Sequence, residues 1–244
     1  MKLSFVIPAH NEEKYLAACL DSVFSALQTG DHGIEVIVVN NASTDATRSV
    51  AERYPSVRIV DEPRKGLSSA RQAGFKASSG DLVANVDADT RLPTGWIEFV
   101  LRDFNKNPKL VGLSGPHILY DVPRLVRYWT QIFYYFGFLT YLINRHVLNI
   151  SSILQGGNFI VRRSALEKIG GFNPEFTFYG EDADLVKRLH KIGEVNFTLK
   201  LPIYASGRRV MAEGKFTMAF RYFLNYLWAT FLGRPFTTTS RDIR

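Results

Sequence analysis

The chain has 244 residues, 46% of them hydrophobic, which is enough for one large α/β domain with a full core or for two small ones. Its single cysteine, Cys19, excludes an internal disulfide and makes a reducing compartment the default. The net charge of +7 fits an anionic substrate or an anionic membrane surface. We disfavour nucleic acid, because the basic residues are scattered and no nucleic-acid motif is present.

The first hundred residues alternate between strand and helix patterns. The chain opens on a strand pattern rather than a signal peptide, and we therefore expect a cytoplasmic protein. Strands are predicted at residues 3–7, 34–39, 57–60 and 82–86, and helices at residues 12–27, 44–54 and 67–77. Such alternation favours a parallel sheet with right-handed crossovers.

Polar side chains follow each predicted strand of this first half. They lie at residues 10–12, 40–41, 61–62 and 87–89. Ligands of open α/β sheets bind beyond the carboxyl ends of the strands, so these groups are expected to meet at one edge.

Asp87 and Asp89 end the fourth predicted strand, two residues apart on an extended backbone, and so point the same way. Two carboxylates aimed together repel unless a cation lies between them. A hard divalent ion takes oxygen ligands and commonly keeps phosphate oxygens in its shell, so the pattern suits a metal-bound diphosphate. The alternative is an ordinary turn, where Asp is common for its own hydrogen bonds.

The second half is less regular. Helices are predicted at residues 93–107, 164–169 and 182–192, and strands at residues 110–114 and 158–161. Two aromatic-rich stretches, residues 129–144 and 216–232, are shorter than the ~20 residues that a membrane-spanning helix needs. Both suit a helix lying in the membrane interface, since aromatics with flanking Arg favour that location, and a dimer interface or core packing stays open for both.

Four motifs in this order resemble glycosyltransferase family 2, whose members have the A-type nucleotide-diphospho-sugar fold. The similarity covers roughly residues 3–210, and the tail after about residue 207 is not well covered. The motifs are residues 6–12, residues 38–45, residues 66–74 leading to 80–81 and 87–89, and residues 170–172 followed by 180–185.

The resemblance implies a Rossmann-like three-layer α/β/α sandwich with a mostly parallel central sheet. We expect a catalytic domain at residues 1–210, with a nucleotide-binding half at 1–90 and an acceptor-binding half at 91–210. Residues 211–244 would form an aromatic, amphipathic helical extension. The implied activity is metal-dependent, inverting transfer of a sugar from a nucleotide-diphospho-sugar, with a UDP-sugar favoured, to an acceptor hydroxyl.

By the same resemblance, Asp89 is the direct ligand of a Mg or Mn divalent cation, and Asp87 contacts the ribose or the water shell of the metal. The metal neutralises the charge that develops on the diphosphate leaving group. The nucleotide pocket is expected to be formed by Pro8, Ala9, Asn11, Glu12, Asn41, Gly66, Arg71, Asp87 and Ala88.

Asn41 departs from the family, which usually has an Asp there that accepts a hydrogen bond from a base ring N–H. An amide oxygen can still accept, although the side chain also donates and carries no charge. Arg71 is expected to bond phosphate oxygens through its fork.

Asp182 is the catalytic candidate, since the family uses the Asp of its Glu-Asp pair as general base toward the acceptor hydroxyl. Glu181, together with Gly157 and Asn158, is expected to bind the acceptor, a glycan or a lipid-linked molecule. Both acids would also be favourable merely as residues of a helix N-terminus. Arg208 and Arg209 follow the last predicted strand and either hold the diphosphate or a phosphate on the acceptor, or lie in a solvated turn.

Two other functions compete. A nucleotidyltransferase would share the sheet but usually has a Gly-rich basic loop after the first strand, which residues 8–12 lack. A catalytically altered nucleotide-sugar-binding or scaffold protein on the same fold gains weight from Asn41, whereas retention of Asp87, Asp89 and Asp182 argues against it. A homodimer and a peripheral location on the cytoplasmic membrane face are further expectations.

Overall fold

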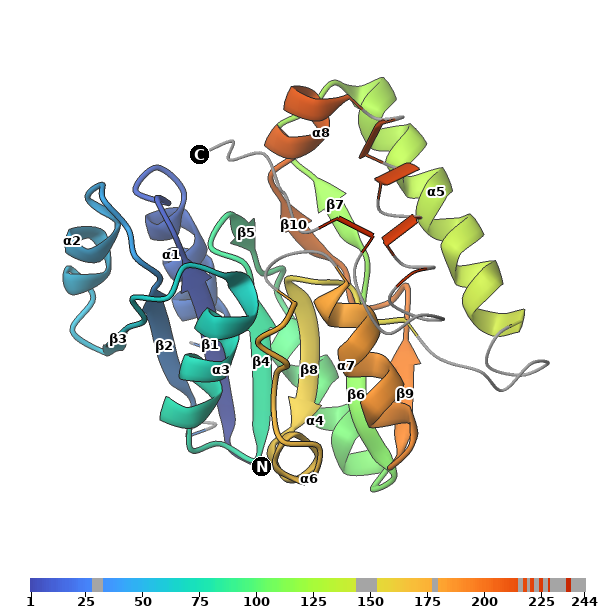
Figure 1. Ribbon diagram of the computed structural model, residues 1–244, viewed down its shortest axis with the longest axis horizontal. Helices are drawn as coiled ribbons and strands as arrows, with labels where there is room; N and C mark the ends of the chain where they lie inside the picture. The colour runs from blue at the N-terminus through green and yellow to red at the C-terminus, as the bar shows by residue number, and fades with distance from the viewer. Residues whose placement is uncertain are drawn as a thin grey trace.

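The computed structural model of the chain describes residues 1–27, 33–143, 153–176 and 180–214, together with residues 217, 218, 220, 221, 224, 225, 228, 236 and 237. A seven-stranded sheet lies at its centre with helices on both faces (Figure 1). This arrangement confirms the predicted three-layer α/β/α sandwich.

The strand order of the central sheet is β3-β2-β1-β4-β8-β6-β9, and only β8 runs against its neighbours. The remaining pairs are parallel, as the alternating pattern of the first half predicted. The strands are β1 (Leu3–Ala9), β2 (Glu35–Asn40), β3 (Val57–Asp61), β4 (Leu82–Val86), β6 (Leu110–Ser114), β8 (Asn158–Arg162) and β9 (Glu194–Phe197).

The two helical layers bury opposite faces of β1. Phe5 and Ile7 pack with helices of one layer, whereas Val6 packs with helices of the other. The first layer consists of α1 (Leu16–Leu27), α2 (Thr47–Glu52) and α4 (Trp96–Lys106), and the second of α3 (Leu67–Ala77), α6 (Arg163–Lys168) and α7 (Glu181–His190).

A second, three-stranded sheet of order β5-β10-β7 was not predicted. It consists of β5 (Thr90–Arg91), β7 (His117–Leu119) and β10 (Ile203–Ala205), whose two or three residues are too short to show a period. β5 directly follows the acidic residues at the end of β4, and its antiparallel pairing with β10 brings the segment after β10 beside them. That segment contains α8 (Arg208–Glu213).

Helix α5 (Arg124–Ile143) contains most of the first aromatic stretch and packs beside β7 at the upper right of Figure 1. It begins five residues before the predicted stretch, and position 144 is not described. The predicted helix at residues 216–232 lies largely outside the described residues. Among the residues that are described, no helix combines the length and apolar character that crossing a membrane requires. The domain limits at residues 90 and 210 stay a prediction.

Candidate active site

The loops after β1, β2 and β3 are bonded to one another through their backbones. The backbone N–H of Asn41 donates to Ala9 O at 2.8 Å, and that of Glu62 donates to Asn40 O at 3.0 Å. His10 Nδ1 also lies 2.7 Å from Asn41 O. The polar groups predicted to meet at the carboxyl ends of the strands therefore do meet, at what we call the donor edge: the loops following β1, β2, β3 and β4.

Asn11 connects the first loop to the second. Its Oδ1 accepts a hydrogen bond from the backbone N–H of Thr44 at 2.8 Å, and its own N–H donates to Ser43 Oγ at 3.2 Å. Asn11 has φ of 52°, a left-handed conformation that Asn tolerates better than most residues. The Asn11 amide thus caps the loop after β2 rather than helix α1. Pro8 and Ala9, which precede Asn11, are buried.

Asn41 is buried and its amide is fully oriented by backbone groups. Nδ2 donates to the carbonyls of Glu62 at 2.9 Å and Arg64 at 2.8 Å, and Oδ1 accepts from the N–H of Gly66 at 2.9 Å. A flipped amide would set its oxygen against two carbonyl oxygens, so chemistry fixes this orientation. The amide of the residue that departs from the family pattern therefore fastens the loop after β2 to the loop after β3, and only its oxygen can accept a further hydrogen bond.

Arg71 joins the two groups of acids that the sequence singled out. Its guanidinium is fully buried; Nη2 donates to Asp87 Oδ1 at 3.1 Å, and Nη1 pairs with Glu181 Oε1. We expected Arg71 to contact phosphates, and the structure places it between two carboxylates, Asp87 after β4 and Glu181 at the start of α7. The Phe159 ring lies 5.0 Å from the guanidinium carbon and covers it from one side.

Two glycines before β8 let the backbone pass between those acids. A Cβ on Gly157 would come within 2.2 Å of Asp87 Oδ2, and one on Gly156 would lie 3.8 Å from Asp182 Oδ2. Gly157 also has φ of +78°, which favours glycine. The Gly156-Gly157 turn therefore lies against Asp87 on one side and Asp182 on the other.

Asp182 lies in the first turn of α7, with Oδ1 accepting the backbone N–H of Ala183 at 2.9 Å. Burial raises the pKa of its carboxyl, although that N–H and the charge of Arg71 both oppose the rise. A carboxylate with a raised pKa binds a proton more strongly, which suits a general base.

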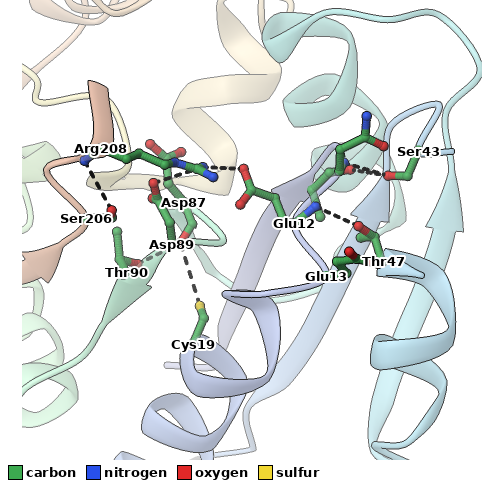
Figure 2. Close-up of polar contacts among 12 residues, drawn as sticks. Glu12, Glu13, Cys19, Ser43, Thr47, Asp87, Asp89, Thr90, Ser206 and Arg208 are labelled. Carbon is green, nitrogen blue, oxygen red and sulfur yellow. Dashed lines mark hydrogen bonds and ion pairs between the residues drawn. The ribbon is translucent and has the colours of Figure 1, made fainter. Parts of the chain in front are cut away.

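Asp89 and Glu12 share one arginine, Arg208, for which the sequence left phosphate binding and a solvated turn both open. Figure 2 shows Arg208 reaching from α8 across the donor edge to Glu12. Its Nη2 lies 3.0 Å from Asp89 Oδ2 and also donates to Glu12 Oε1. Glu12 is held in turn through its backbone N–H, which donates to Thr47 Oγ1 at 2.7 Å.

The carboxylates at the end of β4 fit a divalent cation in two respects, their oxygen donors and the absence of a side chain beside them. Asp87 and Asp89 present oxygen donors, and Gly157 leaves room that any side chain would fill. Within the described ranges there is no group of three or more His, Cys, Asp or Glu side chains that could hold a metal. The protein would thus supply one or two carboxylates, which is how Mg²⁺ is usually held beside substrate phosphates.

Two residues were not placed correctly from the sequence: Asn158 was expected in the acceptor site, and His117 was not singled out. Asn158, expected to bind the acceptor, is completely buried; its Oδ1 accepts from Trp96 Nε1 at 3.3 Å and its Nδ2 donates to Leu201 O at 2.9 Å. His117 was missed. Its Nε2 is buried without a hydrogen-bond partner, and burial lowers its pKa to about 4 despite the charge of Asp87. β7 is too short for any pattern to have indicated this histidine.

Comparisons with known proteins identify the family of the chain. The sequence model of Glycosyl transferase family 2 matches residues 4–170, more than half of the chain, and that of the N-terminal domain of galactosyltransferase matches residues 145–212. A probable glycosyltransferase of Bacillus subtilis, YdaM, is 27% identical over 213 residues, covering 79% of this chain and 47% of the relative. The chain spans only 11% to 62% of the length of the curated relatives considered.

Solved structures share the fold at low sequence identity. A mannosyltransferase of Pyrobaculum calidifontis, in complex with GDP-Man and Mn²⁺, has a TM-score of 0.68 and 22% identity, covering 95% of this chain and 63% of that one. Glucosyl-3-phosphoglycerate synthase of Mycobacterium tuberculosis, with Mg²⁺ and UDP, has a TM-score of 0.63 and 20% identity, covering 96% and 80%.

Proposed function

Because the chain belongs to glycosyl transferase family 2, we propose that it moves a sugar from a nucleotide-diphospho-sugar to an acceptor hydroxyl, with inversion and with the help of a divalent cation. One observation carries this proposal. Arg71 bonds Asp87 and pairs with Glu181, so the carboxylates suited to the donor and those suited to the acceptor belong to one connected site.

The donor would lie along the loops of the donor edge, with its diphosphate at the end of β4. Asp87 and Asp89 would hold Mg²⁺ or Mn²⁺, which when bound neutralises charge on the departing diphosphate. The oriented oxygen of Asn41 can accept from the ring N–H of uracil or guanine, and we favour a UDP-sugar. Pro8, Ala9, Asn11, Gly66 and Ala88 would line the nucleotide pocket.

The acceptor would enter beside the Gly156-Gly157 turn. Its hydroxyl oxygen forms the new bond to the anomeric carbon while the bond from that carbon to the diphosphate oxygen breaks. Asp182 takes the proton of the hydroxyl, and attack from the face opposite the leaving group inverts the anomeric centre. Glu181, fixed by Arg71, orients the acceptor.

Matched substitutions on α7 and β4 test this assignment. Asp182→Asn should keep Mn²⁺-dependent UDP binding and lose transfer, whereas Asp89→Ala should lose the metal-dependent binding itself. Asp184→Asn is the control, because its carboxylate lies on the same helix but bonds Arg188 at 2.6 Å. Binding is followed by calorimetry and transfer by release of UDP from a panel of UDP-sugars and acceptors. Full transfer by Asp182→Asn would refute the base. Tight donor binding with no turnover on any acceptor would favour the nucleotide-sugar-binding alternative.

We further propose that α5 rests on an anionic membrane, which would suit a lipid-linked acceptor in cell-envelope glycan synthesis. Arg124 begins the helix, no acidic residue lies along it, and the whole chain carries a charge of +7, so its charge complements an anionic surface. Its large exposed apolar side chains are Leu125, Tyr128, Trp129, Phe133, Tyr135, Phe136 and Leu139.

Liposome flotation tests the membrane proposal. The protein should float with vesicles containing phosphatidylserine, and the double variant Phe133→Glu/Phe136→Glu should not. A wild-type protein that stays at the bottom of the gradient with anionic vesicles would refute membrane contact. If that protein is also dimeric by light scattering and the double variant monomeric, the face is instead a homodimer interface.

A further inference from the structure

We propose that Arg208 is a built-in competitor of the divalent cation: it holds Asp89 while the donor is absent and transfers to the diphosphate when the donor binds. This inference rests on the proposed function and goes beyond the phosphate contact that the sequence left open for Arg208, because it gives the residue a second partner, Asp89, in the empty site. Its consequence is that metal binds weakly to the empty site and strongly in the presence of the nucleotide diphosphate.

The guanidinium of Arg208 contacts two acids of the donor edge, Asp89 and Glu12. Nη2 lies 3.0 Å from Asp89 Oδ2 and donates to Glu12 Oε1, and the side chain is only 18% exposed (Figure 2). Its carbon Cζ lies 4.7 Å from the centre of the Tyr15 ring, so an aromatic face supports the planar group. These contacts come from two segments: the connection between β1 and α1, which contains Glu12 and Tyr15, and the residues after β4, which contain Asp89.

Arg208 stays charged under all ordinary conditions. Burial alone would lower its pKa, but the hydrogen bond to Glu12 and the charge of Asp89 hold the pKa above its usual range. A divalent cation at Asp89 would therefore face a fixed positive charge at hydrogen-bond distance from the same carboxylate. At such separations two like charges repel strongly, and more so away from bulk water. Metal binding to Asp89 requires the guanidinium to withdraw.

The donor supplies a reason for withdrawal. A diphosphate brought to the end of β4 offers several anionic oxygens, and a guanidinium fork bonds two such oxygens at once. Arg208 is the first residue of α8. Two residues before it, the backbone N–H of Ser206 donates to Asp89 O at 3.1 Å. This backbone bond keeps the arginine close to the site after its side chain leaves the Asp89 carboxylate. Diphosphate and metal thus each favour the binding of the other, because both remove the Arg208–Asp89 pair.

Arg208→Gln tests the proposal through two affinities that should move in opposite directions. With no nucleotide present, we expect Mn²⁺ to bind about tenfold more tightly to the variant, which is the size of effect expected for a hydrogen bond to a charged group. With Mn²⁺ present, UDP should bind about tenfold more weakly. Mn²⁺ binding is measured by electron paramagnetic resonance and UDP binding by calorimetry.

Arg209→Gln is the matched control. The neighbouring arginine removes the same charge from the same helix, but its Nη1 bonds Glu213 at 2.8 Å. Both affinities should stay within twofold of wild type in this variant. Equal Mn²⁺ affinities in Arg208→Gln and wild type would overturn the proposal, and so would a gain of the same size in Arg209→Gln.

Hydrogen exchange of the wild-type protein gives a second readout that needs no variant. Mn²⁺ alone should speed exchange at the backbone amides of α8, and adding UDP should restore their protection. No change in α8 on adding saturating Mn²⁺ would overturn the proposal even if Arg208→Gln does not fold. A failure of the proposed function would differ from this outcome, because it would appear as absent sugar transfer while the Mn²⁺ and UDP affinities remained measurable.

Discussion

Arg71 and Asp87 are joined by a hydrogen bond of 3.1 Å from a guanidinium that has no exposed surface. The same group pairs with Glu181, whose side chain is 6% exposed. A buried charge of this kind is costly unless its partners satisfy it, so each of the three residues depends on the others. The link connects α3 with the end of β4 and the start of α7, and it holds these three elements in a fixed relation.

Removal of the guanidinium should therefore destabilise the whole domain. Arg71→Gln leaves two carboxylates without their counter-charge, and we expect a loss of about 3–5 kcal/mol in the free energy of unfolding. Urea denaturation followed by circular dichroism measures it. The double variant Arg71→Gln/Glu181→Gln should be more stable than Arg71→Gln alone, because the second substitution also removes the buried carboxylate charge of Glu181 that Arg71 had neutralised. Equal stabilities of the single and double variants would contradict this coupling.

A methyl group on Gly157 should displace the Asp87 carboxylate as well as strain the backbone. Gly157→Ala puts a Cβ 2.2 Å from Asp87 Oδ2 at φ of +78°, so Asp87 must move and Mn²⁺-dependent UDP binding should weaken at least about tenfold. Calorimetry measures the affinity.

Gly95→Ala is the matched control for that variant. Gly95 has nearly the same φ, +80°, but nothing lies within 4 Å of the added Cβ. Both variants should lose about 1–2 kcal/mol of stability from left-handed strain, and only Gly157→Ala should lose affinity. An equal loss of affinity in both would show that strain, not the contact with Asp87, is responsible.

Restoring the family's usual acid at position 41 should harm this protein. Asn41→Asp replaces two donated hydrogen bonds, to Glu62 O and Arg64 O, with a carboxylate facing two carbonyl oxygens. We expect a loss of about 1–3 kcal/mol for each buried group left without its partner. Asn40→Asp is the neighbouring comparison: it sets a carboxylate against that of Asp61, but in an exposed position where water screens the repulsion, so its loss of stability should be smaller. A stable Asn41→Asp protein with tighter UDP binding would contradict the structural role assigned to this amide.

The pH dependence of transfer should report the environment of Asp182. Burial raises the pKa of this carboxyl, and a general base acts only when unprotonated. Activity should therefore be present above the raised pKa and fall as the pH drops through it, at a higher pH than an exposed aspartate would give. The profile of kcat/KM measures this, with UDP binding followed over the same range as control. Activity that persists into the ordinary aspartate range would exclude Asp182 as the base.

Sequence periodicity predicted most of the central sheet because its strands and helices are long and regularly patterned. The bounds of α3, β4 and β6 agree with prediction, whereas α1 begins at Leu16 and α2 at Thr47, three or four residues late, because the intervening residues form loops that bond to one another. The small sheet was missed, since its strands have only two or three residues each, too few for an alternating pattern to repeat.

The acidic site residues could be predicted because they belong to short sequence motifs. The ion pairs between residues far apart in the sequence could not be predicted. Asp87, Asp89, Glu181 and Asp182 were singled out from spacing and resemblance. The partners of Arg71 and Arg208 could not be, because both arginines bond residues brought close only by the sheet and by β10. Asn41 looked like a weakened base contact, and only the three backbone groups around it give the substitution a reason.

The reversed direction of β8 has a consequence for engineering. Strands β1, β2 and β4 end at the donor edge, whereas β8 begins there, so the Gly156-Gly157 turn before β8 lies at the same edge, beside Asp87 and Asp182. Loops that would choose the nucleotide and those that would choose its recipient thus belong to separate, oppositely running stretches of the polypeptide. Grafting a foreign sequence ahead of Gly156 should alter what is glycosylated while leaving the choice of activated sugar intact.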